Sequence, residues 1–197
     1  MRIVVCDPGA SNVRSVVRAV EKAAGAAPIV TAEPDVVRSA DVVVVPGQGA
    51  FGPFARAIEG GLGEALVETI RAGRPYLGIC LGLQVLFETS EEAPGAKGLG
   101  ILRGHVRRLR PGAGMPLPHI GWNAVARAGE PTRHFYFAHS FVAAPEDAGI
   151  VHATTEYGET FASAIAHEAI AGVQFHPEKS QREGLALLAR FFERKHL

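Results

Sequence analysis

The chain has 197 residues, of which 47% are hydrophobic and 20% charged, and its positive and negative side chains balance to a formal net charge of zero. This composition predicts one globular domain over 1–197. The balanced charge disfavours nucleic acid as a partner, because nucleic acid binds to basic surfaces. No apolar run approaches the roughly 18 consecutive residues that a membrane span needs. Two cysteines are too few for a disulfide framework, and the N-terminus shows no signal-peptide pattern, so we expect a cytoplasmic protein.

The first half of the chain alternates short apolar runs with amphipathic helical patterns. Residues 2–6 and 41–45 are rich in valine, which is typical of buried parallel strands, whereas Val13, Val16 and Val20 fall on one face of a helix. Strands are expected at 2–6, 28–31, 41–45 and 76–79, and helices at 13–25, 62–72 and 81–88. This order implies a three-layer α/β fold with a mostly parallel central sheet and helices on both faces.

After residue 98 the apolar runs become shorter and no longer alternate with helical patterns. They predict strands at 99–103, 106–109, 123–126, 135–138, 150–154 and 161–166. No linker separates these strands from the first half, so we expect antiparallel additions to the same sheet. A further buried strand is expected at 171–175, followed by a helix whose face of Leu185, Leu188 and Phe192 packs on the sheet.

One cysteine lies between two glycines in G-I-C-L-G (78–82), where a strand is expected to end and a helix to begin. This form is typical of a nucleophile elbow, whose glycines let the backbone pass close on both sides of a strained turn. The start of the following helix should stabilise a thiolate on Cys80. The alternative is that Cys80 packs in the core as a small hydrophobic residue, because free cysteines are most often buried. Cys6 has no flanking glycines, and we interpret it as a buried structural residue of this kind.

A nucleophile of this kind needs a base and a group that orients the base. Of the eight histidines, seven have ordinary explanations as strand-face, loop or terminal residues, whereas His176 follows a buried strand in G-V-Q-F-H-P-E-K-S (172–180). Glu178 lies two residues further on, on the same side of an extended segment, and Pro177 restricts the backbone between them. The sequence therefore predicts a catalytic triad of Cys80, His176 and Glu178.

The glycine-rich segment P-G-Q-G-A-F-G (46–52) follows the central strand and offers backbone N–H groups with little side-chain obstruction. Together with the N–H of Leu81, the segment around Gly47 and Gly49 predicts an oxyanion hole for an acyl intermediate. It is not a nucleotide loop, because the chain has neither a dinucleotide fingerprint nor a phosphate-loop motif. No cysteine and histidine spacing is typical of zinc ligands, so the sequence predicts no metal and no cofactor.

Taken together, these motifs resemble those of the triad-type class I glutamine amidotransferases, which have a flavodoxin-like core. They resemble most closely those of the glutaminase subunits of imidazole glycerol phosphate synthase, over nearly the whole chain. The stretches that carry the resemblance are D-P-G-A-S-N-V-R-S-V (7–16), P-G-Q-G-A-F (46–51), P-Y-L-G-I-C-L-G-L-Q-V-L-F (75–87), G-L-G-I-L (98–102), P-H-I-G-W-N (118–123), Y-F-A-H-S-F (136–141) and H-P-E-K-S (176–180). The elbow and H-P-E specify only the superfamily, whereas P-H-x-G-W-N and Y-F-x-H-S-[YF] point to this subunit.

The resemblance implies that glutamine is hydrolysed through a cysteine thioester. Cys80 would attack the side-chain amide, His176 would relay protons, and Glu178 would orient His176, so that ammonia and then glutamate leave. The ammonia would pass to a cyclase subunit, a (β/α)8 barrel, in a heterodimer. That subunit would form imidazole glycerol phosphate and aminoimidazole carboxamide ribotide, as in histidine biosynthesis.

The resemblance also implies roles for residues outside the triad. The residues implied to contact the substrate glutamine are Gln84 and the backbone near His139, Ser140 and Phe141. The residues implied to lie towards the cyclase are Trp122, Asn123 and Lys179. For Trp122, an ordinary half-buried core position is the alternative interpretation.

The chain departs from the pattern of this family in two places. Gln48 stands between the glycines where the family has a hydrophobic residue, at a peptide that is implied to change orientation when the partner is loaded. Near the N-terminus, Pro8 and Ser11 replace a tyrosine and a glycine, which makes that turn stiffer. Neither change touches the predicted triad.

Three other functions remain open from the sequence. The chain could be the glutaminase subunit of another synthase of the anthranilate or aminodeoxychorismate type, but those differ in the glycine loop and lack P-H-x-G-W-N. A free-standing γ-glutamyl hydrolase or cysteine peptidase could use the same elbow, although Gln84 and H-P-E-K-S argue against it. A scaffold without activity is the third possibility, and the intact triad pattern argues against that.

Overall fold

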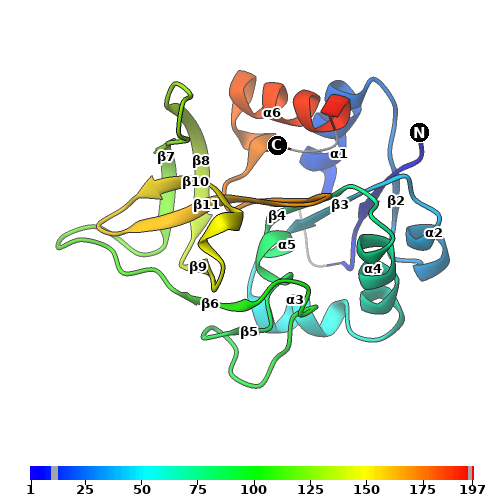
Figure 1. The fold of residues 1–197 in the computed structure, drawn as a ribbon, viewed down its shortest axis with the longest axis horizontal. Coiled ribbons are helices and arrows are strands. Elements are labelled where there is room, and N and C mark those ends of the chain that lie inside the picture. The colour runs from blue at the N-terminus through cyan, green and yellow to red at the C-terminus, as the bar shows by residue number, and fades with distance from the viewer. Residues whose placement is uncertain (10–12, 195–196) are drawn as a thin grey trace.

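A seven-stranded sheet forms the centre of the molecule in a computed structural model that describes residues 1–9, 13–194 and 197 (Figure 1). The strand order is β10-β11-β12-β4-β3-β1-β2. The bounds are β1 Ile3–Cys6, β2 Ile29–Thr31, β3 Val42–Gly47, β4 Tyr76–Cys80, β10 Val151–Glu156, β11 Thr160–His167 and β12 Ile170–Val173. The five strands from β12 to β2 are parallel, and β11 and β10 join them antiparallel, as predicted for a mostly parallel sheet with antiparallel additions.

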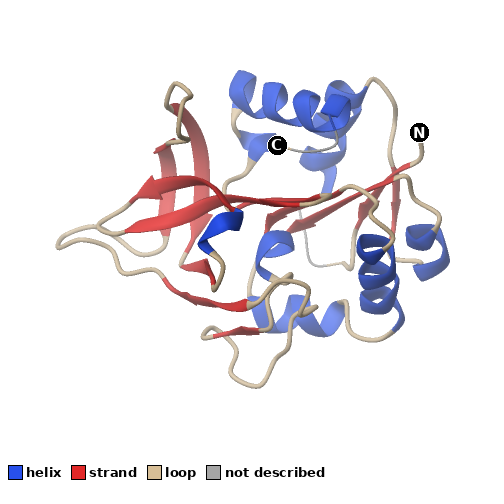
Figure 2. Cartoon of the chain, viewed as in Figure 1, coloured by secondary structure: helices blue, strands red, loops and turns tan. Residues whose placement is uncertain are grey.

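Helices cover both faces of this sheet, as Figure 2 shows. One layer contains α1 (Val13–Ala24) and α6 (Gln181–Arg194), and the other contains α2 (Pro34–Arg38), α3 (Phe51–Ala57), α4 (Gly61–Arg71) and α5 (Leu81–Gln84). The valine-rich strands supply both cores, because successive side chains of a strand point to opposite faces. Val4 and Val43 pack with the α3–α5 layer, whereas Val5 and Val44 pack with α1 and α6.

Two smaller sheets lie beside the central one, and here the sequence prediction was wrong. β5 (Thr89–Ser90), β6 (Gly104–Arg108) and β9 (Phe141–Pro145) form a three-stranded sheet, and β7 (His119–Val125) pairs with β8 (Arg133–His139) in a hairpin. The strands expected at 106–109, 123–126 and 135–138 therefore exist, but they do not extend the central sheet. Instead, the hairpin meets the end of that sheet at two places. The His176 N–H donates to the Tyr136 carbonyl at 2.8 Å, and Ala126, which follows β7, forms an antiparallel bridge with Thr154 of β10.

Two further expectations, in neighbouring segments, were also wrong. No strand forms at 99–103, and the helix expected at 81–88 ends at Gln84. The backbone N–H of Leu99 donates to the Val85 carbonyl at 2.6 Å, and those of Ile101 and Leu102 donate to the Leu86 carbonyl at 2.9 Å. These bonds hold residues 99–102 as a loop against the segment that follows α5. The helix itself ends early because the Gly82 carbonyl accepts from the Tyr76 hydroxyl at 2.8 Å, and the N–H groups of Leu86 and Phe87 donate to carbonyls three residues back instead of four.

No helix in the described part of the chain is long and apolar enough to span a bilayer. Ser11, one of the two substitutions noted near the N-terminus, lies outside the described residues. The short 3-10 helices η1 (Ala148–Ile150) and η2 (Pro177–Lys179) complete the elements, and η2 carries the glutamate of the predicted triad.

Candidate active site

The predicted elbow is present where β4 meets α5. Cys80 has φ 54° and ψ −106°, a conformation that is uncommon for a residue with a side chain. The flanking glycines are required by close packing. A Cβ on Gly82 would overlap the Val45 carbonyl, and one on Gly78 would overlap the Gly82 carbonyl. The turn therefore packs backbone against backbone, and its cysteine side chain remains 6% exposed.

His176 and Glu178 reach the elbow from the neighbouring strand. β12 lies beside β4 in parallel, with Val173 opposite Ile79, so the residues that follow both strands meet at one edge of the sheet. Nδ1 of His176 donates to Oε1 of Glu178 at 2.8 Å, and both side chains are 5% exposed. The His176 ring also lies close enough to Cys80 for that residue to raise the pKa of the ring. The structure thus brings the three residues of the predicted triad together.

The histidine of this arrangement is held in its protonated form. Burial alone lowers the pKa of His176, but hydrogen bonds and charge interactions with Cys80 and Glu178 raise it to about 10. A protonated imidazole can act as a proton donor, which is the role that a general acid needs. At the other cysteine, Cys6, burial and the Asp7 charge raise the pKa of the thiol to about 12.

The glycine loop passes directly beside the nucleophile. Gly47 is the last residue of β3 and lies opposite Cys80 in the β3–β4 ladder. A Cβ at Gly47 would overlap the Leu81 side chain, so only glycine fits there. Gly49 has φ 100°, a conformation that favours glycine, while Gln48 between them is exposed. Of the predicted oxyanion residues, Gly47 at the end of β3 is therefore the ladder partner of Cys80, and Leu81 at the start of α5 is its neighbour in the chain.

A pair of glutamines adjoins the sulfur. Gln84 on α5 donates from Nε2 to the Phe141 carbonyl at 3.0 Å and to Oε1 of Gln174 at 3.0 Å. Gln174 in turn donates from Nε2 to Cys80 Sγ at 3.6 Å. Within the described part of the chain, Oε1 of Gln84 is buried and accepts no hydrogen bond. Sequence reasoning did not single out Gln174, whose only signal is its position two residues before His176.

The residues expected to face a partner lie on the β7–β8 hairpin and on η2. Trp122 is 48% exposed and packs edge-on against Tyr136, with ring centroids 6.2 Å apart. Lys179 Nζ lies 5.9 Å from the centre of the same tyrosine ring. Asn123 differs, because its amide points inward and donates to the Glu156 carbonyl at 3.0 Å. Trp122 and Lys179 therefore share one surface, and the Asn123 side chain bonds within the chain.

His119 and His139 form a buried pair at one end of this hairpin, where they lie opposite each other in the β7–β8 ladder. Their exposed fractions are 3% and 6%, and Nδ1 of His119 lies 3.1 Å from Nε2 of His139. Burial lowers the pKa of His119 to about 4. Burial and the neighbouring charges of His119 and His176 lower the pKa of His139 to about 3, against an opposing hydrogen bond with Phe141. Both rings are therefore neutral at pH 7.

This pair predicts that the fold is sensitive to acid. Between about pH 6.5 and pH 4 the unfolded chain binds protons at His119 and His139 and the folded chain does not, so stability falls as the pH falls. The free energy of unfolding should drop by up to about 2.7 kcal/mol per pH unit from these two groups. Urea unfolding at pH 7, 6 and 5 measures it, and a variant with His119→Asn and His139→Asn should show a shallower slope. Equal slopes would contradict the assignment.

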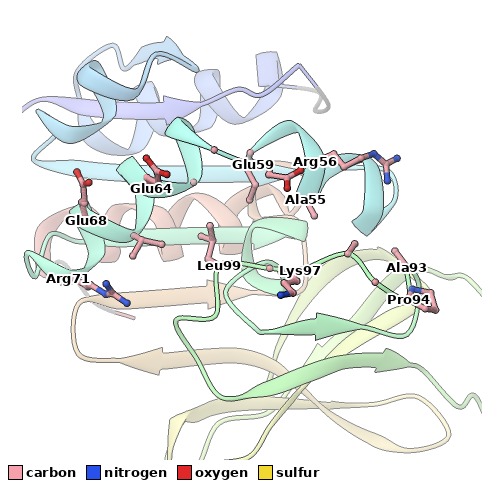
Figure 3. A pocket seen from close by; sticks show the side chains of 17 residues that line it. Ala55, Arg56, Glu59, Glu64, Glu68, Arg71, Ala93, Pro94, Lys97 and Leu99 are labelled. Carbon is pink, nitrogen blue, oxygen red and sulfur yellow. The ribbon is translucent and has the colours of Figure 1, made fainter.

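A broad groove of about 1000 Å³ lies elsewhere, between α3, α4 and the loop 93–99 (Figure 3). Its walls carry both signs of charge, with Glu64, Glu68 and Arg71 on α4 and Lys97 on the facing loop. None of the predicted site residues lines it. In addition, no group of three or more histidine, cysteine, aspartate or glutamate side chains among the described residues could hold a metal ion.

Residues 4–195 match the family model described as glutamine amidotransferase class-I. The chain is 42% identical over 198 residues to imidazole glycerol phosphate synthase subunit HisH of Methanothermobacter thermautotrophicus, covering 97% of this chain and 98% of that protein. It is 43% identical over 200 residues to the protein of the same name from Nostoc punctiforme, covering 96% and 94%.

Two solved structures share the fold at low sequence identity. A crystal structure described as glutamine amidotransferase has a TM-score of 0.79 at 19% identity, covering 99% of this chain and 98% of that one. PurLQS from Thermotoga maritima has a TM-score of 0.73 at 18% identity, covering 98% and 96%. These structures confirm the predicted fold class.

Proposed function

Because the chain belongs to the class I glutamine amidotransferase family, we propose that it is the glutaminase subunit of an imidazole glycerol phosphate synthase. The family hydrolyses glutamine. The relatives that are 42% and 43% identical over nearly the whole chain carry the name of that subunit. The observation that carries the chemical part of the proposal is the buried contact of Cys80, His176 and Glu178 at the ends of two adjacent parallel strands.

In the first half of the proposed reaction, the Cys80 thiolate attacks the side-chain amide carbon of glutamine. The resulting oxyanion accepts hydrogen bonds from backbone N–H groups near Gly47 and Gly49 and from Leu81. The C–N bond then breaks, and His176 gives its proton to the departing nitrogen, which leaves as ammonia. A pKa of about 10 supports this role, because the imidazolium is present at neutral pH before substrate arrives.

In the second half, the enzyme is a glutamyl thioester and His176 is neutral. His176 takes a proton from a water molecule, which attacks the thioester carbonyl. The C–S bond breaks, glutamate leaves, and the thiolate–imidazolium pair is restored. Throughout, Glu178 accepts from Nδ1 of His176 at 2.8 Å and so keeps Nε2 directed at the sulfur.

Recognition of the substrate is assigned to Gln84 and to the segment 139–141. Both hydrogens of the Gln84 amide nitrogen are used inside the chain, so its orientation is fixed. Among the residues that the structure describes, the oxygen is a buried acceptor without a partner, and such a group costs free energy until it is satisfied. The ammonium group of a bound glutamine would supply the missing donor.

The partner is proposed to be the cyclase subunit, a (β/α)8 barrel, in a cytoplasmic heterodimer. Trp122 and Ile120 are 48% and 62% exposed on β7, which is unusual for large apolar side chains and typical of interfaces. Trp122, Tyr136 and Lys179 form one surface. The backbone of Tyr136 is hydrogen-bonded to that of His176, so this surface lies directly beside the triad.

The proposal is tested by measuring glutamate release from the purified chain, alone and with a histidine-pathway cyclase carrying its nucleotide ligand. We expect turnover to rise by about 5- to 150-fold on adding the loaded cyclase, the range of ordinary allosteric coupling. The matched control is the large subunit of an anthranilate synthase, which should cause no rise.

Other outcomes of that measurement separate the alternatives. Strong turnover that the cyclase does not change would overturn the pairing and indicate a free-standing γ-glutamyl hydrolase. Activation by the anthranilate subunit would reassign the synthase. If no condition gave glutamate, the chain would be a scaffold without activity.

A further inference from the structure

A chain of hydrogen bonds connects the β7–β8 hairpin to the Phe141 carbonyl. Nδ1 of His139 lies 3.0 Å from that carbonyl oxygen, which can only accept, so this nitrogen carries the hydrogen. Since the ring is neutral, Nε2 of His139 is an acceptor and receives the hydrogen of His119 Nδ1 at 3.1 Å. The remaining nitrogen, Nε2 of His119, accepts from Asn123 Nδ2 at 3.3 Å. These hydrogen bonds therefore fix, for both imidazole rings, which nitrogen carries the hydrogen.

The Phe141 carbonyl is where this chain meets the glutamine site. It accepts from His139 and from Gln84 Nε2, each at 3.0 Å. Beyond Gln84 the bonds continue through Oε1 and Nε2 of Gln174 to the Cys80 sulfur. Donors and acceptors match at every step from Asn123 to Cys80, and the group left free is the Gln84 oxygen that the proposed function assigns to substrate.

The setting of the two histidines argues for a specific role. The His119 ring is stacked between Tyr157 and Phe137, with centroid distances of 3.9 and 4.8 Å, and His139 packs against Phe161 at 5.3 Å. An apolar side chain would suit such a place without the cost of desolvating two imidazoles. A buried polar network in which every group is hydrogen-bonded holds its members in one geometry. Apolar side chains at the two histidine positions could not hold the Phe141 carbonyl and the Gln84 amide in this way.

We propose that His119 and His139 are positioning residues for glutamine: they hold the Phe141 carbonyl against Gln84, and Gln84 in turn presents its free oxygen to the substrate. The inference rests on the proposed glutaminase activity and adds a role for two imidazole side chains to it. Neither imidazole exchanges a proton with the substrate. They act through Phe141 and Gln84, so their loss should weaken glutamine binding far more than it slows the chemical steps.

The test is the separation of KM from kcat in His139→Leu, His139→Asn and His119→Leu, measured under the condition that gives the wild type its highest turnover. His139→Leu removes the donor to Phe141, and we expect KM for glutamine to rise about 10- to 100-fold with kcat changed less than about threefold. His139→Asn should recover part of that loss, because its amide nitrogen occupies nearly the place of Nδ1. The matched control is His134→Leu, on the exposed side of the same strand, which should leave KM unchanged.

A double variant shows whether the pair acts as a unit. If His119 acts only through His139, the combined His119→Leu and His139→Leu changes should raise KM no further than His139→Leu alone. Circular dichroism establishes that each variant is folded, and His139→Asn, the smallest change, remains informative if a leucine variant fails to fold. A lower melting temperature with unchanged KM in His139→Asn and His139→Leu would overturn the inference. No turnover by the wild type would overturn the proposed function instead.

Discussion

Replacing Cys80 with alanine is expected to lower glutamate formation by at least about 10⁴-fold, because the covalent route through the thioester is lost. What remains should come from binding and from the oxyanion donors alone. The measurement is glutamate release at saturating glutamine in the presence of the activating partner. Residual turnover above about one per cent of the wild type would show that the reaction does not proceed through this sulfur.

The chain contains its own control for that experiment. Cys6 is the other free thiol, fully buried at the end of β1, and its pKa of about 12 keeps it protonated. Cys6→Ala should therefore retain turnover within about threefold and lose only a little stability. Iodoacetamide should likewise react with Cys80 and not with Cys6. Activity should therefore be lost rapidly in both the wild type and Cys6→Ala, and bound glutamine should slow the loss in both.

Replacing Glu178 with glutamine is expected to lower kcat by about 10³- to 10⁴-fold, by analogy with the loss of an orienting carboxylate in other triads. Glutamine has nearly the same shape, but it removes the charge that fixes the His176 tautomer. It also removes one of the causes that raise the pKa of His176. The imidazolium should then lose its proton at a lower pH, and the alkaline limb of the pH–rate profile should move towards neutrality.

The control for this change is Glu183→Gln, five residues further along the chain. Glu183 forms ion pairs with Arg133 and Arg182 and does not touch the triad. Its loss should change kcat less than threefold, since partly exposed ion pairs contribute little. If Glu178→Gln left the pH profile where it is in the wild type, Glu178 would have a packing role and the proposed mechanism would lose its orienting group.

The central sheet was predictable from the sequence, because its strands carry their own signal. Residues 3–6, 42–47 and 76–80 are buried on both faces and read as continuous apolar runs between turn residues. The apolar residues Leu99 and Ile101 misled the same rule, since they pack against the main core from a loop. The short helices α2 and α3 were missed. Gly52 and Pro53 make the sequence of α3 read as a loop.

The triad was predictable for a related reason, namely that its members belong to short motifs. Cys80 stands between glycines, and His176 and Glu178 are two residues apart. Gln174 and His119 were missed because their partners are distant in the chain. Gln174 meets Gln84 and Cys80 across 90 and 94 residues, and the His119–His139 contact requires the β7–β8 register. No local pattern marks a residue whose meaning depends on a long-range contact.

The position of β12 determines when the enzyme can first act. β12 pairs with β4 on one side and β11 on the other, and His176 follows it by three residues, 96 residues after the nucleophile (176 − 80). At roughly 5–20 residues per second, the base leaves the ribosome about 5–20 s after Cys80. Until then β4 is an edge strand and Cys80 has no imidazolium beside it. A growing chain therefore has its nucleophile without a base, and ammonia production waits for β12 to insert beside β4.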